Sequence, residues 1–245
     1  MRKVILHYHL FKNAGTSLDA AFKENFSEEK GEWVTKEFPN QPAANREQVR
    51  QWILDNPQAK CFSSHTALFP VPEFDDIQVF PVIFVRHPID RIASAYAFER
   101  KQNGSTFGSV LARNTSLKGY IETRLALPHD RQCRNFHVSR FSSGTTNSEI
   151  SELEKALKEA DKLPFVGLVE NFDRSIEKLN SVLSDCWADG NYLSVKKQNV
   201  SSRKKGSLEE KLSSIRDELG EVFFNELMLL NEDDIALLNF CADKY

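Results

Sequence analysis

The chain has 245 residues, of which 40% are hydrophobic and 27% charged, a balance typical of a soluble globular protein. Its formal net charge of −3 argues against a nucleic-acid partner, because domains that bind nucleic acids usually carry a positive excess. No apolar run approaches the ~18 residues that a bilayer span requires, so we expect no membrane span and a cytoplasmic location. The four cysteines are scattered without the spacing of metal ligands, and no metal site is implied.

The first predicted element is a strand over residues 4–9, an apolar and partly β-branched run that precedes a helical pattern. The loop between them reads Phe11, Lys12, Asn13, Ala14, Gly15, Thr16 and Ser17. Unpaired N–H groups at such a helix start lie at the positive end of the helix dipole and can hold a phosphate. Gly15 permits close backbone approach, and Lys12 adds a positive charge.

The order of residues in this loop differs from that of a nucleotide triphosphate loop, in which Lys and Ser/Thr follow the last glycine. Here Lys12 precedes Gly15, and the hydroxyls of Thr16 and Ser17 follow directly. The alternative is an ordinary strand–turn–helix in which Gly15 is only the turn residue.

The next predicted elements are a helix over residues 45–56 and a short central strand over residues 60–64. His65 follows that strand, and its ordinary pKa near 6.5 suits a general base. The alternative for His65 is a hydrogen-bonded histidine at a strand end with no chemical role.

A second strand-to-helix corner lies at residues 79–96. The continuous apolar run of residues 79–85 predicts a buried parallel strand, and Pro88 suits the entry to a helix. Arg86 and Ser94 are eight positions apart (94 − 86), and the turn between strand and helix would let both approach one phosphate. The alternative is a corner whose arginines only face solvent.

Beyond this corner the pattern is mostly helical. Residues 103–145 are expected to be an insertion that shapes a substrate site, with short helices at 117–127 and 134–141. A helix at 147–162 and a strand at 163–170 follow, and residues 207–243 carry further helical patterns. Between them, residues 196–206 form a basic, hydroxyl-rich loop, whose alternative interpretation is a solvated linker.

Strands that alternate with helices predict an α/β fold with a central parallel sheet, and residues 1–245 fit a single domain. In such folds ligands bind beyond the carboxyl ends of the strands. Lys12, His65, Arg86 and Glu170 all follow a predicted strand, so we expect them to gather at one edge of the sheet.

The two corners resemble those of sulfotransferases that use 3′-phosphoadenosine 5′-phosphosulfate (PAPS). In that family the first loop often reads H-x-P-K-[TA]-[GA]-[ST]-[ST]; here Phe11 stands where Pro is common, and one extra residue separates Lys12 from Gly15. The second motif, R-[DH]-P-x-x-R-x-x-S-x-Y, matches in register at Arg86, Pro88, Arg91, Ser94 and Tyr96. The strand at 163–170 is similar to one in the type-2, carbohydrate-directed branch. The resemblance implies a P-loop-like, three-layer fold with helices on both faces of the sheet.

The resemblance also implies roles for individual residues. Lys12 would stabilise the transferring group, and His65 would act as the base. The 5′-phosphate would be bound by Lys12, Asn13, Ala14, Gly15, Thr16 and Ser17. The 3′-phosphate would be bound by Arg86 and Ser94, with Ser202 and Arg203 in the late loop that closes over the adenosine. No metal is implied, and adenosine 3′,5′-bisphosphate would be the product.

The expected function is therefore transfer of a sulfuryl group from PAPS to a hydroxyl acceptor, most consistent with a carbohydrate or glycolipid. One alternative is a P-loop kinase or another NTP-dependent phosphotransferase, but such enzymes usually place a carboxylate after a strand to hold Mg²⁺, and the strand at 79–85 ends in Arg86. Another is a non-catalytic nucleotide-binding module, which would need neither Lys12 nor His65. The sequence leaves the oligomeric state open.

Overall fold

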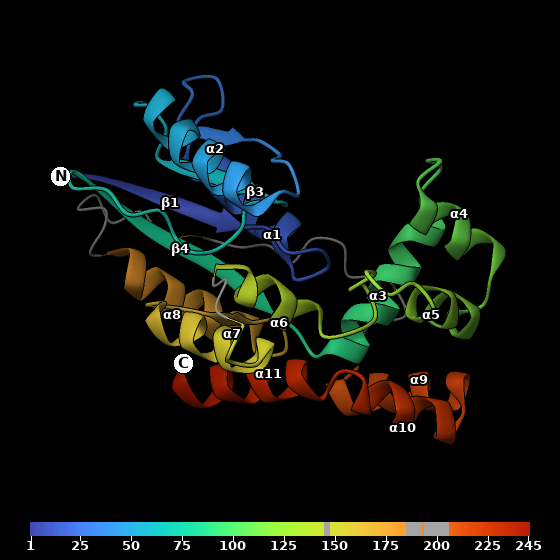
Figure 1. Cartoon of the computed structure of the whole chain (residues 1–245). Helices are drawn as coiled ribbons and strands as arrows, with labels where there is room; N and C mark the ends of the chain where they lie inside the picture. Colours follow the sequence, from blue (N-terminus) through green and yellow to red (C-terminus); the bar gives the residue numbers. More distant parts are fainter. Residues whose placement is uncertain (145–147, 185–192, 194–205) are drawn as a thin grey trace.

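A computed structural model describes residues 1–144, 148–184, 193 and 206–245 (Figure 1). Its centre is a five-stranded sheet with the strand order β2-β3-β1-β4-β5, in which every pairing between neighbours is parallel. The strands are β1 (Arg2–Tyr8), β2 (Trp33–Thr35), β3 (Cys61–Ser64), β4 (Ile77–Val85) and β5 (Gly167–Leu168). Tyr8 lies opposite both Ser64 and Ile83, so the loops that follow β1, β3 and β4 leave the sheet at the same edge.

Helices follow the strands and extend well beyond the sheet (Figure 1). In the first half of the chain they are α1 (Gly15–Asn25), α2 (Pro42–Asp55), α3 (Pro88–Lys101), α4 (Phe107–Asn114) and α5 (Leu117–Leu125). The second half contains α6 (Phe136–Phe141), α7 (Glu152–Lys162), α8 (Phe172–Ser184), α9 (Leu208–Leu219), α10 (Glu221–Leu229) and α11 (Glu232–Lys244). Several begin with a serine or threonine whose side chain accepts a hydrogen bond from the first turn, at Thr106, Ser116, Ser151 and Ser207.

Helices cover both faces of the sheet, because successive side chains of a strand point to opposite faces. Val4, Leu6 and Tyr8 pack into one buried cluster with apolar residues of α2, α6, α7 and α11. Ile5 packs on the other face, in a cluster formed with α1 and α8. The predicted three-layer α/β architecture is therefore confirmed.

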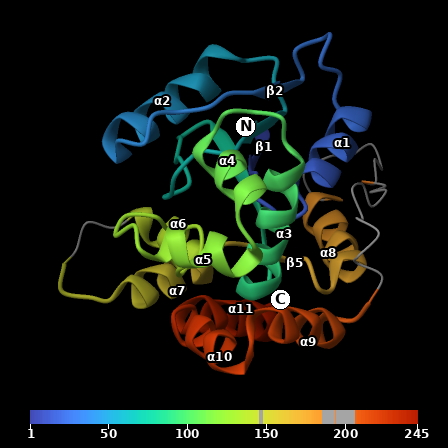
Figure 2. The ribbon, with the colours of Figure 1, turned by 90° about the vertical axis from the view of Figure 1, so that its right-hand side faces the viewer.

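A third apolar cluster lies outside the sheet. It joins α3, α4 and α5 to α9 and α10, with Tyr120, Ile121 and Leu227 fully enclosed. Figure 2 shows this helical region facing the viewer, in front of the sheet. Of the predicted insertion, α4 and α5 thus form a helical layer with α3, α9 and α10, whereas α6 packs on the sheet.

The sequence predicted most strands within two residues, but it missed one and overestimated another. β2 was not predicted, since its three residues are too short to show a period. The expected strand at 163–170 is reduced to Gly167 and Leu168, which pair with Phe84 and Val85. Apolar residues in the remainder of that segment, such as Phe165, are buried by packing outside the sheet ladder.

Gly167 is required by close packing, because a Cβ atom there would overlap the ring of Phe84. Both residues are buried, so Gly167→Ala is expected to lower the free energy of unfolding by about 2 kcal/mol through overpacking. The control is Gly104→Ala, where nothing lies within 4 Å of the added carbon. Urea denaturation should leave that control within about 0.5 kcal/mol of the parent. Equal effects of the two changes would contradict this account.

Candidate active site

The loop after β1 turns sharply before helix α1 begins. Lys12 and Ala14 both have left-handed backbone conformations, with φ of 66° and 64°. Non-glycine residues rarely adopt this region, and each costs of order 1–3 kcal/mol unless its surroundings enforce it. The Ala14 carbonyl accepts hydrogen bonds from the N–H groups of Ser17 and Leu18, at 3.0 and 3.3 Å, which closes the first turn of α1. The sharp turn places the start of α1 at the carboxyl edge of the sheet.

Arg86 joins the two strand-to-helix corners. Its Nη1 donates to the backbone carbonyl of Lys12 at 3.1 Å, across 74 positions of sequence. Its Nε and Nη2 contact Oδ2 of Asp90 at 2.8 and 2.6 Å, and both side chains are largely buried. These three contacts use three of the five N–H groups of the guanidinium. The contacts among the described residues leave the other two N–H groups available to a further acceptor. The corner after β4 can therefore hold the loop and still offer donors to an anion.

Glu170 completes this edge of the sheet. One of its carboxylate oxygens accepts the backbone N–H of His87 at 2.7 Å, and the other is buried without a partner among the described residues. Burial raises the pKa of Glu170, against the opposing effect of that hydrogen bond. As expected from the sequence, the residues that follow β1, β4 and β5 meet at one edge.

Lys12 lies beside an aromatic ring. Its Nζ is 4.2 Å from the centroid of Phe98, a cation–π distance, and Phe11 packs edge-on against the same ring. Burial lowers the pKa of Lys12, and repulsion from Arg86 and Lys101 lowers it further. This crowding of positive charge makes the position favourable for an anion.

Asp19 in α1 bridges two histidines of β1 and the turn after it. Its two carboxylate oxygens contact Nδ1 of His7 and Nδ1 of His9, each at 2.7 Å, and Ser63 donates to it at 2.7 Å. Burial alone would raise the pKa of Asp19, but the hydrogen bonds from His7 and His9 hold it well below the ordinary value.

The ligand-type atoms of His7, His9 and Asp19 lie within 4.8 Å of one another, a grouping that can be compared with a metal site. Both imidazoles direct Nδ1 at the carboxylate at hydrogen-bond distance, so an ion would have to displace these contacts. The residues therefore form a satisfied hydrogen-bonded cluster, and the group gives no argument for a metal.

His9 shapes the loop by contact. A Cβ atom at Gly15 would overlap the His9 ring, so only glycine allows α1 to begin against this side chain. Since Asp19 holds His9 in place, the ring cannot move aside cheaply. Gly15 thus has a packing reason that the sequence did not show.

His65 lies against the same histidine. Its ring centroid is 3.9 Å from that of His9, and its Nδ1 is 3.1 Å from the His9 carbonyl oxygen. A carbonyl only accepts, so Nδ1 carries the proton and Nε2 is the basic nitrogen of the neutral ring. Burial of the ring and then the nearby His9 lower the pKa of His65. The residue is exposed overall, so a neutral base is presented beside the loop.

Comparison with known proteins agrees with this geometry. The family model of the Sulfotransferase family matches residues 1–240. An uncharacterized protein of Archaeoglobus fulgidus is 42% identical over 253 residues, covering 100% of this chain and 98% of the relative. The chain belongs to the sulfotransferase family.

The structure places the expected phosphate-binding residues of this sulfotransferase family member as follows. Thr16 is exposed and Ser17 is buried in the first turn of α1. Ser94 is buried in α3, two turns beyond Arg86. The side chain of Asn13 is buried and contacts His137, and its backbone N–H donates to the Leu10 carbonyl at 3.2 Å. Ser202 and Arg203 lie outside the described residues.

Three residues of this sulfotransferase site were not singled out by sequence reasoning for the roles they have here. Asp19 contacts His7 of β1 and His9 just after it, Phe98 contacts Lys12, and Asp234 contacts the ring of His137. Of these three residues, only Asp19 could have been found from a pattern in the sequence. His7 and His9 are two positions apart and share a side, and Asp19 lies one helical turn after Gly15. The other contacts join distant segments.

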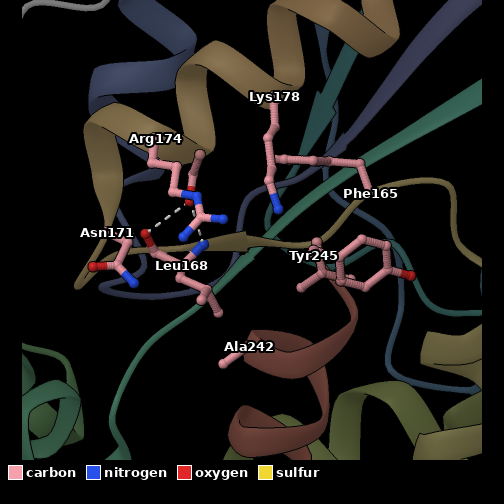
Figure 3. A pocket seen from close by; sticks show the side chains of 9 residues that line it. Phe165, Leu168, Asn171, Arg174, Lys178, Ala242 and Tyr245 are labelled. Atoms are coloured by element: carbon pink, nitrogen blue, oxygen red, sulfur yellow. Dashed lines mark hydrogen bonds between the residues drawn. The ribbon is translucent and has the colours of Figure 1, made fainter.

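A small cavity of about 30 Å³ lies apart from this site, between β5, α8 and the C-terminus of the sulfotransferase (Figure 3). Arg174, Lys178 and Tyr245 line it, and the hydroxyl of Ser175 bonds both backbone polar groups of Leu168 nearby. The volume is that of about one water molecule, too small for a nucleotide.

Within the described residues, no helix is long and apolar enough to cross a membrane.

Replacing Asp19 by asparagine is expected to lower the free energy of unfolding of this sulfotransferase by about 2 kcal/mol at pH 7, because one histidine loses its charged acceptor. The folded-state pKa of Asp19 lies below the ordinary 3.8, so its contribution is complete above that value and is lost as pH falls towards the depressed pKa. Urea denaturation of parent and variant at pH 7 and pH 3 should show a smaller difference at the lower pH. Asp55→Asn, on the exposed end of α2, is the control. A difference that stays constant with pH would contradict the assignment.

Proposed function

We propose that this protein transfers a sulfuryl group from PAPS to a hydroxyl group of a carbohydrate or glycolipid acceptor. Membership of the sulfotransferase family supports sulfuryl transfer in general. The observation that carries the proposal is the hydrogen bond from Arg86 to the Lys12 carbonyl, which brings two anion-binding corners together. A donor with phosphates at both ends of one nucleoside needs two such corners side by side.

The residues at the edge of the sheet suit a donor that carries a phosphate at each end. The start of α1, from Gly15 to Ser17, would receive the 5′-phosphate, since helix N-termini favour anions. Arg86 has two N–H groups left for the 3′-phosphate in the contacts described above, and Ser94 adds a hydroxyl. When bound, PAPS would supply the sulfuryl group.

The chain's own residues would then supply charge and a proton acceptor. The Lys12 ammonium would neutralise the negative charge that develops as the sulfuryl group leaves the donor, an electrostatic role that is worth most in a partly dry site. His65 would take the proton of the attacking hydroxyl on Nε2, while the His9 carbonyl holds Nδ1–H and so fixes the ring. The proton passes from the acceptor oxygen to His65 as the new S–O bond forms.

The acceptor is proposed to be a saccharide or glycolipid. The resemblance to the carbohydrate-directed type-2 branch supports this class. Aromatic side chains offer stacking surfaces for a sugar near Lys12: Phe98 is 40% exposed and contacts the lysine. A location in the cytoplasm remains part of the same proposal.

Binding of the nucleotide product is the first test. Adenosine 3′,5′-bisphosphate at about 100 times its dissociation constant should stabilise the fold by ~2.7 kcal/mol without Mg²⁺, seen as a raised melting temperature. Arg86→Lys keeps the charge but loses the fork of donors, so we expect at least about tenfold weaker binding. Arg113→Lys, which changes an exposed arginine bonded to loop carbonyls, is the matched control. Stabilisation by ATP with Mg²⁺, and none by the bisphosphate, would favour a phosphotransferase instead.

The role of His65 predicts a pH profile. A base works only when deprotonated, and the pKa of His65 is lowered from 6.5, so turnover should rise with pH, with its midpoint below 6.5, and then level off. Transfer of labelled sulfate from PAPS to a panel of saccharides measures this. His65→Ala should lower kcat by about 10²–10⁴-fold and abolish the acid limb, while nucleotide binding is retained. An acid limb that survives in the variant would remove His65 as the base.

A further inference from the structure

The side chain of Asn13 is the innermost part of the loop. It is 2% exposed, its Nδ2 donates to the Phe11 carbonyl at 3.3 Å, and its Oδ1 lies 3.0 Å from Nε2 of His137. His137 belongs to α6 and is 124 positions away in sequence. Asn13, in the loop proposed to bind the 5′-phosphate, is therefore held by His137 of α6.

His137 is in turn held by the last helix. Its Nδ1 lies 3.0 Å from Oδ2 of Asp234, and both residues are 1% exposed. Asp234 also accepts the backbone N–H groups of His137 and Val138 at 3.1 and 2.8 Å. Asp234 thus fixes the start of α6 and the orientation of the imidazole at the same time.

Both ring nitrogens of His137 face acceptors. Asn13 uses Nδ2 for the Phe11 carbonyl and so presents Oδ1 to Nε2, while Asp234 presents a carboxylate to Nδ1. The imidazole is therefore held at both of its nitrogens. Burial alone would raise the pKa of Asp234, but His137 and the two backbone donors hold it below its ordinary value.

We propose that Asp234 and His137 are positioning residues that hold the phosphate-binding loop ready for the 5′ end of the nucleotide. The inference rests on the proposed function, because these two residues lie outside the nucleotide site and act on it only through Asn13. The backbone at Lys12 and Ala14, on either side of Asn13, is left-handed and needs an external hold. The side chain of Asn13 is the point at which α6 and α11 supply that hold.

A neighbouring residue provides a comparison within the same helix region. Asn231 is fully buried just before α11, where it donates to the carbonyls of Cys133 and Leu227 and accepts from the N–H of Asn135. It therefore joins α11 to the segment before α6, as Asp234 does, and in the described part of the chain its hydrogen bonds do not reach the loop. A change at Asn231 removes packing support and leaves the Asn13 contact in place.

Two substitutions of His137 separate its two contacts. Asparagine can place an amide near the position of Nδ1 and keep the contact with Asp234, but it is too short to reach Asn13. Glutamine can place an amide near Nε2 and donate to Oδ1 of Asn13. The two variants therefore separate the contact with Asn13 in the loop from the contact with Asp234 in α11.

The ligands are adenosine 3′,5′-bisphosphate and 3′-AMP, measured by titration calorimetry on the full chain. His137→Asn should weaken the bisphosphate about tenfold and change 3′-AMP by less than about twofold, because only the first nucleotide uses the loop. His137→Gln should restore most of the bisphosphate affinity. Asn231→Ala should lower the melting temperature and leave the ratio of the two dissociation constants unchanged. Equal weakening of both nucleotides by His137→Asn, or no weakening of either, would overturn the proposal.

Hydrogen exchange of the nucleotide-free protein distinguishes this inference from the proposed function. His137→Asn should speed exchange in residues 10–17 by about tenfold relative to Asn231→Ala. Equal exchange in the two variants overturns the loop coupling, whatever the nucleotide result. If the parent binds neither nucleotide, the proposed function falls and the role at the 5′ end falls with it.

Discussion

The hydrogen bond from the Arg86 guanidinium to the Lys12 carbonyl is the interaction on which this site depends. Arg86 follows β4, and Lys12 lies in the loop after β1, the strand that pairs with β4. Arg86 is buried, and Asp90 compensates its charge, so the guanidinium is fixed before any ligand arrives. A fixed donor pair is better suited to anion binding than a flexible one, because less ordering is needed on binding.

The loop between β1 and α1 is held from three directions. The His9 ring packs where a side chain at Gly15 would lie, Arg86 binds the Lys12 carbonyl, and His137 contacts the side chain of Asn13. These contacts come from the residue that follows β1, from the corner after β4, and from α6. A turn with left-handed, non-glycine residues persists only when its surroundings determine it, and these contacts do so.

Polar groups at this edge are buried in linked sets. Asp19 gathers His7, His9 and Ser63 under the loop, and the ring of His65 rests on His9. Charge at one residue of such a set influences the pKa of the others, because the medium is poorly polarisable. The lowered pKa values of His65 and Lys12 thus arise from the same packing that shapes the loop.

The sequence alone determined the α/β class, the parallel sheet and the two corners, because β-branched runs, small-residue loops and helical periods are local properties. It also placed Lys12, His65, Arg86 and Glu170 at one edge, since parallel strands share a direction. Only the tertiary structure decided that Asn13 faces inward, that Gly15 is required by His9, and that β5 is two residues long. The contact from Asp234 through His137 to Asn13 joins segments about 100 residues apart, and no local pattern can show which distant side chains burial will bring together.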